Sequence, residues 1–448
     1  MLEQFQDVLK SYLESNKQVI TVAYSGGVDS TVLLHLAKAY CDHSGNPLRA
    51  IYINHGLSTN SDTWQAHCQS QCNQLNIEFT AAQVKGIEEG QGIEAAARSA
   101  RYEKLAELTD ANTLILLGQH ADDQIETFFL QLLRGAGIDG LSAMPVYKQD
   151  NHSRQYLRPL LSLARGDIEE YADTLSLKWI EDESNADNRF DRNYLRNQVL
   201  PLLKQRWPKS QSTIARSIGH IAEHRDLLDM QADKTLASLI AGESLDLGLL
   251  AMYETAWQRV LLKKWLKKLT VAQPSSAQLQ QLLLQCVDAR EDSTPVVRWG
   301  SVEARLFNNK LYILSDWPEV SLPTISIEIG RTLNLDSYRR GLGELSINAS
   351  SQNSHSLQSQ RFEVQFEGFS RKFKPPGERF SKPLSQWFKI WKVPPWTRGL
   401  VPLVCIDDTV VSVGNAINEN VSNDNDLLGD FKVEWKHQLH YKMFPFEQ

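Results

Sequence analysis

The stretch AYSGGVDST, residues 23–31, decides how the first part of the chain folds. It ends a run, QVITVAY (residues 18–24), whose β-branched residues predict a strand, and it opens a predicted helix over residues 29–40. Two adjacent glycines let the backbone take positive φ and let a ligand approach the peptide amides closely. The helix adds its positive end, so the loop is expected to cradle an anion, with Ser25 and Ser30 as further donors.

A plain turn between a strand and a helix is the competing interpretation of this loop, because Gly-Gly turns are common. A Walker A loop is excluded, since no Gly-Lys-Ser or Gly-Lys-Thr follows the glycines. The loop alone therefore predicts a phosphate site of another kind or an ordinary turn.

Strands and helices alternate outward from this loop. Further strands are predicted at 49–55, 77–84 and 113–120, and helices at 61–75, 93–108 and 122–133. The β-α-β-α order predicts an α/β fold with a parallel sheet and helices on both faces. Ligands of such folds bind at the C-terminal ends of strands. The segments SGGVDS, NHG and GQHADD lie at these ends, which predicts one site at that edge.

The later chain divides by composition. Residues 1–208 are expected to be the α/β domain, and residues 209–315 a mainly helical domain. Residues 316–360 are expected to connect, because they end in the polar run NASSQNSHSLQSQ. Residues 361–448 form a distinct, small C-terminal domain of mixed α+β type.

Bulk properties limit the classes of function. The chain has 448 residues and a net charge of −7, which on average disfavours a nucleic-acid partner. Five scattered cysteines favour reduced thiols in a cytosol. The N-terminus does not resemble a secretory signal, and no apolar run reaches the length of a membrane helix. We therefore expect a cytoplasmic protein without a membrane partner.

Charge reverses locally near the C-terminus. Residues 361–400 contain nine Lys or Arg residues and only three Glu, with aromatic residues between them. Basic groups contact phosphates and aromatic rings stack on unpaired bases, although most of these aromatics are expected to form the core of a β domain. The candidate contacts are Arg371, Lys372, Lys374, Arg379, Lys389, Lys392 and Arg398. A second basic strip at 257–269 is interpreted first as a packed, solvated helix.

Acidic residues gather after the fourth predicted strand. Asp122, Asp123 and Glu126 supply carboxylates at its mouth, and Asp29 lies in the glycine loop. Mg²⁺ prefers oxygen ligands, although acids also commonly complement a helix N-terminus. Arg98 and Arg101 lie three residues apart on one helix, which suits phosphate contact or a salt-bridged surface equally.

These motifs carry a family resemblance. SGGVDS resembles the SGGxDS loop of the N-type ATP pyrophosphatases, which hold ATP and cleave between its α- and β-phosphates. The remaining motifs resemble, in order along nearly the whole chain, those of the tRNA(Ile)-lysidine synthetases. They are IEAAARSARYEKL (93–105), GQHADDQIETFFLQLLRGAG (118–137), RPLL (158–161), WIEDESNADNRFDRNYLRNQVLP (179–201), RKFKPPGERF (371–380) and VPPWTRGLVPLV (393–404).

The resemblance implies domain roles, a fold, a reaction and a set of site residues. Residues 1–208 would be the ATP-pyrophosphatase catalytic domain, 209–315 a domain that binds substrate or tRNA, and 361–448 a tRNA-binding domain. The fold is adenine nucleotide alpha hydrolase-like, and the reaction joins L-lysine to C2 of the wobble cytidine of the CAU-anticodon isoleucine tRNA, with ATP and Mg²⁺. It implies ATP binding by Ser25, Gly26, Gly27, Val28, Asp29, Ser30, Arg98, Arg101 and His120. It implies catalytic roles for Asp29, Asp122, Asp123 and Glu126, with Asp29 and Asp123 as Mg²⁺ ligands.

The lysine site stays open at this stage. Asp182, Arg192, Asn193 and Arg196 are candidates for lysine or another substrate, or form an ordinary helix start. A homodimer is possible. The alternatives are a tRNA thiolase of the same superfamily and a non-catalytic tRNA-binding protein. The thiolase is disfavoured because the cysteines further along the chain, Cys286 and Cys405, lie far apart in the sequence. The binding protein is disfavoured by the intact loop.

Overall fold

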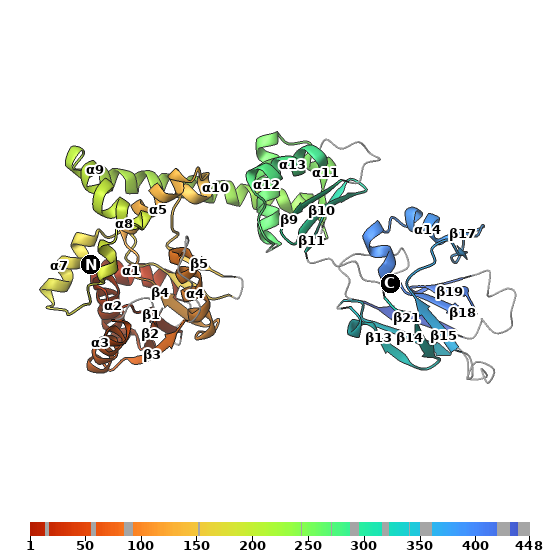
Figure 1. The fold of residues 1–448 in the computed structure, drawn as a ribbon, viewed down its shortest axis with the longest axis horizontal. Helices are drawn as coiled ribbons and strands as arrows, with labels where there is room; N and C mark the ends of the chain where they lie inside the picture. The colour runs from red at the N-terminus through yellow and green to blue at the C-terminus, as the bar shows by residue number, and fades with distance from the viewer. Residues whose placement is uncertain are drawn as a thin grey trace. The chain divides into compact units, whose positions relative to one another are not determined.

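The computed structural model describes two compact units, Met1–Leu228 and Asp229–Gln448 (Figure 1). The described residues are 1–13, 18–54, 60–84, 93–150, 153–242, 244–269, 271–286, 295–315, 322–339, 341–349, 361–418 and 431–437. The side chains of residues 91–98 and 184 lie outside this description.

The first unit is built on a six-stranded sheet in the order β3-β2-β1-β4-β6-β5. Its strands are β1 (Val19–Ala23), β2 (Leu48–Asn54), β3 (Glu78–Gln83), β4 (Thr113–Leu116), β5 (Tyr147–Gln149) and β6 (Gln155–Leu157). All pairs are parallel except β5 with β6. The centre of β1 and all of β4 are buried, as expected for strands covered on both faces. The predicted parallel α/β fold is confirmed.

The sheet changes direction at β1. The chain runs from β1 outward through β2 to β3, and then returns to the other side of β1 to form β4. This makes the gap between the ends of β1 and β4 the topological switch point, where α/β sheets bind ligands. The loops after these two strands carry residues 24–27 and 117–120.

Helices cover the sheet and extend beyond it (Figure 1). They are α1 (Leu2–Tyr12), α2 (Val28–Ser44), α3 (Ser61–Gln74), α4 (Ile93–Glu107), α5 (Ala121–Leu133), α6 (Ile138–Leu141) and α7 (Arg165–Thr174). After the short turn η1 (Glu183–Ala186) come α8 (Asp191–Tyr194), the π-helical turn η2 (Leu195–Val199), α9 (Leu200–Arg206) and α10 (Ser210–Leu239). The compact units divide within α10, whereas composition predicted a division at residue 208.

The second unit begins with a mixed fold. The sheet β7-β8-β11-β10-β9 shares a core with α12 and α13, in which Leu261, Trp265 and Leu282 are buried. The strands are β7 (Ile240–Ala241), β8 (Ser244–Asp246), β9 (Val296–Trp299), β10 (Val302–Phe307) and β11 (Lys310–Ser315), and the helices are α11 (Leu247–Leu250), α12 (Thr255–Lys268) and α13 (Ser276–Cys286). Strands β9, β10 and β11 match the short strands that the sequence predicts over VVRWGSVEARLFNNKLYIL (296–314). Strands β7 and β8 are too short to show a period of two, so the sequence predicted only helices at residues 240–246.

The basic strip predicted at 257–269 is helix α12, packed as expected. One face is in the core, and Lys264 Nζ lies 2.9 Å from Asp229 Oδ1 while Lys268 Nζ lies 2.9 Å from Asp233 Oδ1. The charge of this strip is therefore partly neutralised within the protein. Among the described residues, none of the helices is long and apolar enough to cross a membrane.

Residues of the expected connecting segment belong to the C-terminal fold, which corrects that expectation for 325–349. Strand β12 (Ile325–Glu328) pairs with β15 (Arg361–Gln365), and β14 (Glu344–Ala349) pairs with β13 (Thr332–Asn334) and β21 (Phe431–Lys436). Leu345 and Ile347 are buried on alternate positions of β14, which drives this pairing. Most of the polar run, residues 350–360, lies outside the described residues.

The remaining elements complete this C-terminal fold. They are η3 (Leu335–Ser337), β16 (Lys372–Phe373), β17 (Lys382–Pro383), α14 (Leu384–Ile390), η4 (Pro395–Leu400), β18 (Leu403–Ile406), β19 (Thr409–Val413) and β20 (Ala416–Ile417). Its core holds Phe373, Trp387 and Phe388, so most of the interleaved aromatics are structural, as expected.

Candidate active site

The glycine loop forms a tight turn between β1 and α2. Gly26 has φ of +84°, a conformation that favours glycine, and a Cβ there would lie 2.6 Å from Cδ1 of Ile180. Gly27 has φ of −70° and caps the N-terminus of α2. The expectation of positive φ is therefore confirmed at Gly26 and wrong at Gly27, because a helix cap takes an extended conformation that any residue can adopt.

Hydrogen bonds inside the turn fix its shape. The Ser25 amide donates to Ser30 Oγ at 3.2 Å, and Ser30 Oγ donates to the Gly27 carbonyl at 3.0 Å. The Ile180 amide donates to the Gly26 carbonyl at 2.9 Å. The Ser30 hydroxyl thus braces the turn rather than reaching outward, and the side chain of Val28 is buried. What the turn offers to a ligand is mainly backbone amides and the helix N-terminus.

The loop after β4 approaches this turn closely. A Cβ on Gly118 would lie 3.3 Å from the Ser30 backbone nitrogen, so the absence of a side chain at residue 118 allows the two loops to pack. Sequence reasoning placed GQHADD at the same sheet edge but did not identify this glycine as the contact.

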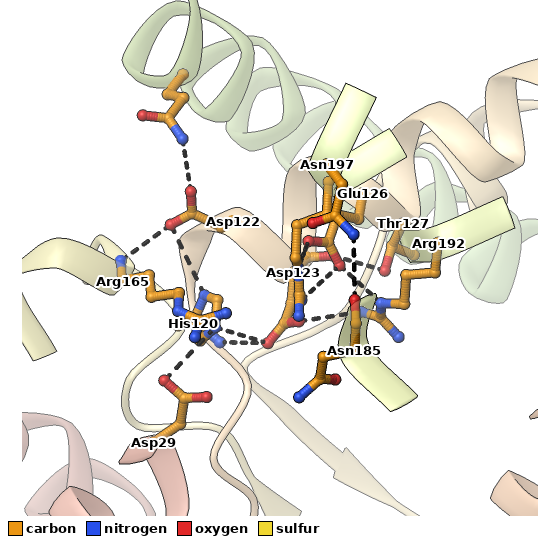
Figure 2. Close-up of polar contacts among 12 residues, drawn as sticks. Asp29, His120, Asp122, Asp123, Glu126, Thr127, Arg165, Asn185, Arg192 and Asn197 are labelled. Carbon is orange, nitrogen blue, oxygen red and sulfur yellow. Dashed lines mark hydrogen bonds and ion pairs between the residues drawn. The ribbon is translucent and has the colours of Figure 1, made fainter. Parts of the chain in front are cut away.

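His120 connects carboxylates from both loops (Figure 2). It is buried at the N-cap of α5, where its amide donates to Asp123 Oδ2 at 3.1 Å. Its Nε2 lies 3.6 Å from Asp29 Oδ1 and 3.4 Å from Asp123 Oδ2, and its Nδ1 lies 3.8 Å from Asp122 Oδ2. The structure therefore brings together the four predicted residues Asp29, His120, Asp122 and Asp123.

Asp29 is held in an unfavourable state for a carboxylate. Burial raises the pKa of its carboxyl group, opposed by the charges of His120 and Arg165. Its buried Oδ1 accepts no hydrogen bond from any described residue. A buried carboxylate oxygen without a donor costs free energy, and a bound cation would remove that cost.

The carboxylates fit a Mg²⁺ that is held partly by substrate. No group of three or more His, Cys, Asp or Glu suited to a metal ion occurs among the described residues. Mg²⁺ commonly uses one or two protein carboxylates together with substrate phosphates and water. Asp29, whose Oδ1 accepts no hydrogen bond from a described residue, satisfies that requirement.

Glu126 is fully buried and committed to two arginines. Its Oε1 accepts from Arg196 Nε at 2.6 Å, and its Oε2 accepts from Arg192 Nε at 2.7 Å and from Arg196 Nη2 at 3.0 Å. Asp123 Oδ1 accepts from both guanidinium groups at 3.2 Å. The pKa of Arg196 is raised. Burial alone would lower this pKa, but the hydrogen bond and charge of Glu126 and the charge of Asp123 outweigh the effect of burial. Glu126 thus positions Arg192 and Arg196.

Asp122 joins three elements. Its Oδ2 accepts from the Arg165 backbone amide at 2.9 Å, and its Oδ1 accepts from Gln211 Nε2 at 2.5 Å. These bonds tie α5 to the starts of α7 and α10. Sequence reasoning missed Arg165 and Gln211, because neither stands in a motif and both meet Asp122 only through the tertiary fold.

Other predicted residues lie around this cluster. Asn193 Nδ2 donates to the Asp187 carbonyl at 3.0 Å, which braces the segment before α8. Burial, Cys68 and the charge of Asp182 raise the pKa of Tyr52 to about 12. Arg101 is exposed on α4, and the side chain of Arg98 lies outside the described residues.

The candidate RNA contacts of the C-terminal domain differ in exposure. Arg371 Nη2 donates to the Glu367 carbonyl at 2.7 Å, and Arg398 Nε donates to the Val393 carbonyl at 3.1 Å, so both brace the fold. Phe380 is 64% exposed, unlike the core aromatics. Lys374 is half-buried, whereas Lys372, Arg379, Lys389 and Lys392 are exposed.

The cysteines are poor nucleophiles. All five are buried free thiols, and burial raises the pKa of Cys68 and Cys72 to about 12. Thiolate chemistry needs a lowered pKa. This environment disfavours the sulfur-transfer alternative.

A glycine turn at the switch point of a parallel sheet, opening a helix and facing carboxylates from the next loop, defines a PP-loop ATP-binding protein. The family model of the PP-loop domain matches residues 1–203. Models of the TilS substrate binding domain and the TilS substrate C-terminal domain match residues 245–312 and 362–430.

Curated relatives narrow the class. The tRNA(Ile)-lysidine synthase of Coxiella burnetii is 35% identical over 402 residues, covering 88% of this chain and 87% of the relative. That of Yersinia pseudotuberculosis serotype O:1b is 36% identical over 449 residues, covering 96% and 98%. The chain belongs to the tRNA(Ile)-lysidine synthase family, which confirms the resemblance seen in its sequence.

A solved structure is similar at a lower level. A U34-tRNA thiolase from Methanococcus maripaludis is 18% identical with a TM-score of 0.42, covering 50% of this chain and 78% of its own. This similarity is too weak to bear on activity.

Proposed function

We propose that the protein ligates lysine to C2 of the wobble cytidine of the CAU-anticodon isoleucine tRNA, through an adenylated cytidine, with release of pyrophosphate and AMP. The observation that carries this proposal is the similarity of 35–36% to tRNA(Ile)-lysidine synthases over about nine-tenths of the chain. The glycine turn at the switch point supports the use of ATP.

The chemistry requires activation of the cytidine. An amide-like carbonyl oxygen is a poor leaving group, and adenylation converts it into AMP, a good one. Phosphoryl chemistry of this kind depends on positioning and on charge stabilisation. We assign both to the backbone amides of residues 26–30 and to the N-terminus of α2, with Ser30 bracing the turn by accepting from the Ser25 amide.

Asp29 and Asp123 are the proposed Mg²⁺ ligands. Asp29 Oδ1 accepts no hydrogen bond from a described residue, which supports this assignment, as does the position of His120 within 3.6 Å of both carboxylates. When bound, Mg²⁺ would shield the negative charge of the triphosphate. His120 then keeps the two carboxylates at a fixed separation.

The lysine must arrive as a neutral amine. Free lysine has a pKa of about 10.4, so very little of it is neutral at pH 7. Glu126 is an unsuitable base, because both of its oxygens accept from arginines. We propose that Glu126 instead presents Arg192 and Arg196 to an anionic substrate group. Asp182 stays a candidate for the amine.

One assay tests the function. The protein is incubated with Mg-ATP, labelled lysine and unmodified CAU-anticodon isoleucine tRNA, and the same tRNA with uridine at the wobble position is the control. Lysine label in the first tRNA alone, with one pyrophosphate released per label, is expected. The absence of lysine label from the tRNA would refute the proposal, and so would tRNA modification that requires a sulfur donor. Light scattering tests the possible homodimer.

A further inference from the structure

A basic segment of the first unit extends beyond the carboxylate cluster of the candidate active site. Residues 192–222 contain six Lys or Arg and no Asp or Glu, in a chain whose net charge is −7. Arg192 and Arg196 are used by the carboxylate cluster. Arg216 lies within α10, and the other three stand at the junction of α9 and α10. There Lys204, Arg206, Trp207 and Lys209 are all exposed. We call these four residues the basic corner.

The charges of the basic corner are not neutralised by the part of the protein that the structure describes. No described acidic residue forms an ion pair with Lys204, Arg206 or Lys209. The lysines of α12 contrast with them, because Lys264 and Lys268 pair with Asp229 and Asp233. The basic corner therefore suits an anionic partner better than the basic strip of α12 does.

The corner also presents an aromatic ring in a fixed position. Trp207 is 58% exposed, and the Arg206 guanidinium lies 5.7 Å from the centre of its ring. The Trp207 amide donates to the Leu203 carbonyl at 2.7 Å, and the Ser210 amide donates to the Trp207 carbonyl at 2.8 Å. Pro208 further restricts the backbone. A large exposed ring on so constrained a backbone is available for stacking without reordering the chain.

The corner is tied to the candidate active site. Gln211, four residues after Trp207, donates to Asp122 at 2.5 Å, and Asp122 lies 3.8 Å from His120. Four residues of chain span at most about 14 Å even when fully extended. A polynucleotide whose reacting base lies at the carboxylates would therefore pass the corner with a neighbouring nucleotide.

We propose that Trp207 stacks on an unpaired base of the tRNA beside the nucleotide being modified, while Lys204, Arg206 and Lys209 contact the adjoining phosphates. This inference rests on the proposed function, since it takes single-stranded RNA as the ligand. Unpaired bases stack on aromatic rings, and clustered cations follow the backbone. Trp207 is thus a positioning residue that fixes which loop nucleotide reaches the site.

The stacking is tested with the full chain and an isolated anticodon stem-loop that carries 2-aminopurine in the loop. Trp207→Ala should weaken RNA binding by about 5- to 100-fold and abolish the change in 2-aminopurine fluorescence. Trp207→Phe should restore most of both. The control Leu227→Ala removes an apolar side chain that is 60% exposed on α10, and should leave both unchanged.

The charge contribution has its own measurement. Replacement of Lys204, Arg206 and Lys209 by Gln should reduce the slope of log affinity against log salt by about 2, since each single-strand phosphate contact contributes about 0.7. Lys10→Gln, an exposed lysine on α1, is the control and should leave the slope unchanged. In every variant, ATP-analogue binding should match the wild type, which verifies folding.

Two results separate this inference from the proposed function. The protein could bind RNA in a manner that depends on Trp207 and yet fail to incorporate lysine. That result would support RNA binding by the basic corner and refute the proposed lysine ligation. Lysine incorporation and stem-loop binding that are both unaffected by Trp207→Ala would overturn the corner and leave the reaction intact.

Discussion

Replacement of Glu126 by Gln should destabilise the first unit strongly. The wild-type carboxylate is fully buried and accepts three guanidinium hydrogen bonds of 2.6–3.0 Å from Arg192 and Arg196. An amide removes the charge and turns one oxygen into an NH₂ group that faces an N–H donor. Breaking a buried ion pair from one side costs about 3–5 kcal/mol, because the remaining charges stay buried. That is a large part of the stability of a typical domain.

Urea unfolding monitored by circular dichroism measures this cost. The matched control is Glu169→Gln, because Glu169 pairs with Arg165 at 2.8 Å but is 45% exposed, and exposed pairs contribute about 0–1 kcal/mol. We expect a large fall in the urea midpoint for Glu126→Gln and little change for the control. Equal midpoints for the wild type and Glu126→Gln would refute the reasoning that Glu126 is a structural anchor for the arginines.

Three further predictions concern the glycine turn, the buried carboxylate and the thiols. Gly26→Ala should lower both stability and ATP affinity, because residue 26 has a φ of +84° and a Cβ there would contact Ile180. Thermal shift and calorimetry measure the two effects. The control Gly27→Ala, whose Cβ meets nothing nearer than 3.8 Å, should fold like the wild type. Asp29→Asn should abolish turnover yet raise the free energy of unfolding without ligand by about 1 kcal/mol. Since burial raises the Asp29 pKa above 3.8, the folded wild type loses stability as pH rises through that pKa, so the advantage of Asn should appear as pH rises and vanish near pH 4. Cys68 and Cys72, with pKa values of about 12, should resist iodoacetamide at pH 8 until the protein is unfolded, as mass spectrometry would detect, and rapid native alkylation would contradict their burial.

The sequence predicted those parts of the fold that depend on local pattern. The strand run at 18–24, the glycine turn and the apolar helix after it specify one β-α unit, and repetition of that unit specifies the parallel sheet. Strands β7 and β8 were missed because two or three residues carry no period. Residues 325–349 were assigned to a connection, because their pairing with β15 and β21 spans sequence distances that no local pattern shows.

The candidate site was predictable in part. Asp29, His120, Asp122 and Asp123 stand at the ends of adjacent strands, so their proximity follows from the topology of the sheet. The commitment of Glu126 to Arg192 and Arg196 was not predictable, because it depends on how the π-helical turn η2 meets α5. The contact between Gln211 and Asp122, and with it the placement of the basic corner, also depends on tertiary packing alone.

A crystal structure with Mg²⁺ and a non-hydrolysable ATP analogue tests the central claim most directly. The account predicts phosphate oxygens within hydrogen-bond distance of the backbone amides of residues 26–30 and a cation on Asp29. Electron density for the triphosphate at any other part of the sheet edge, with this turn unliganded, would contradict it.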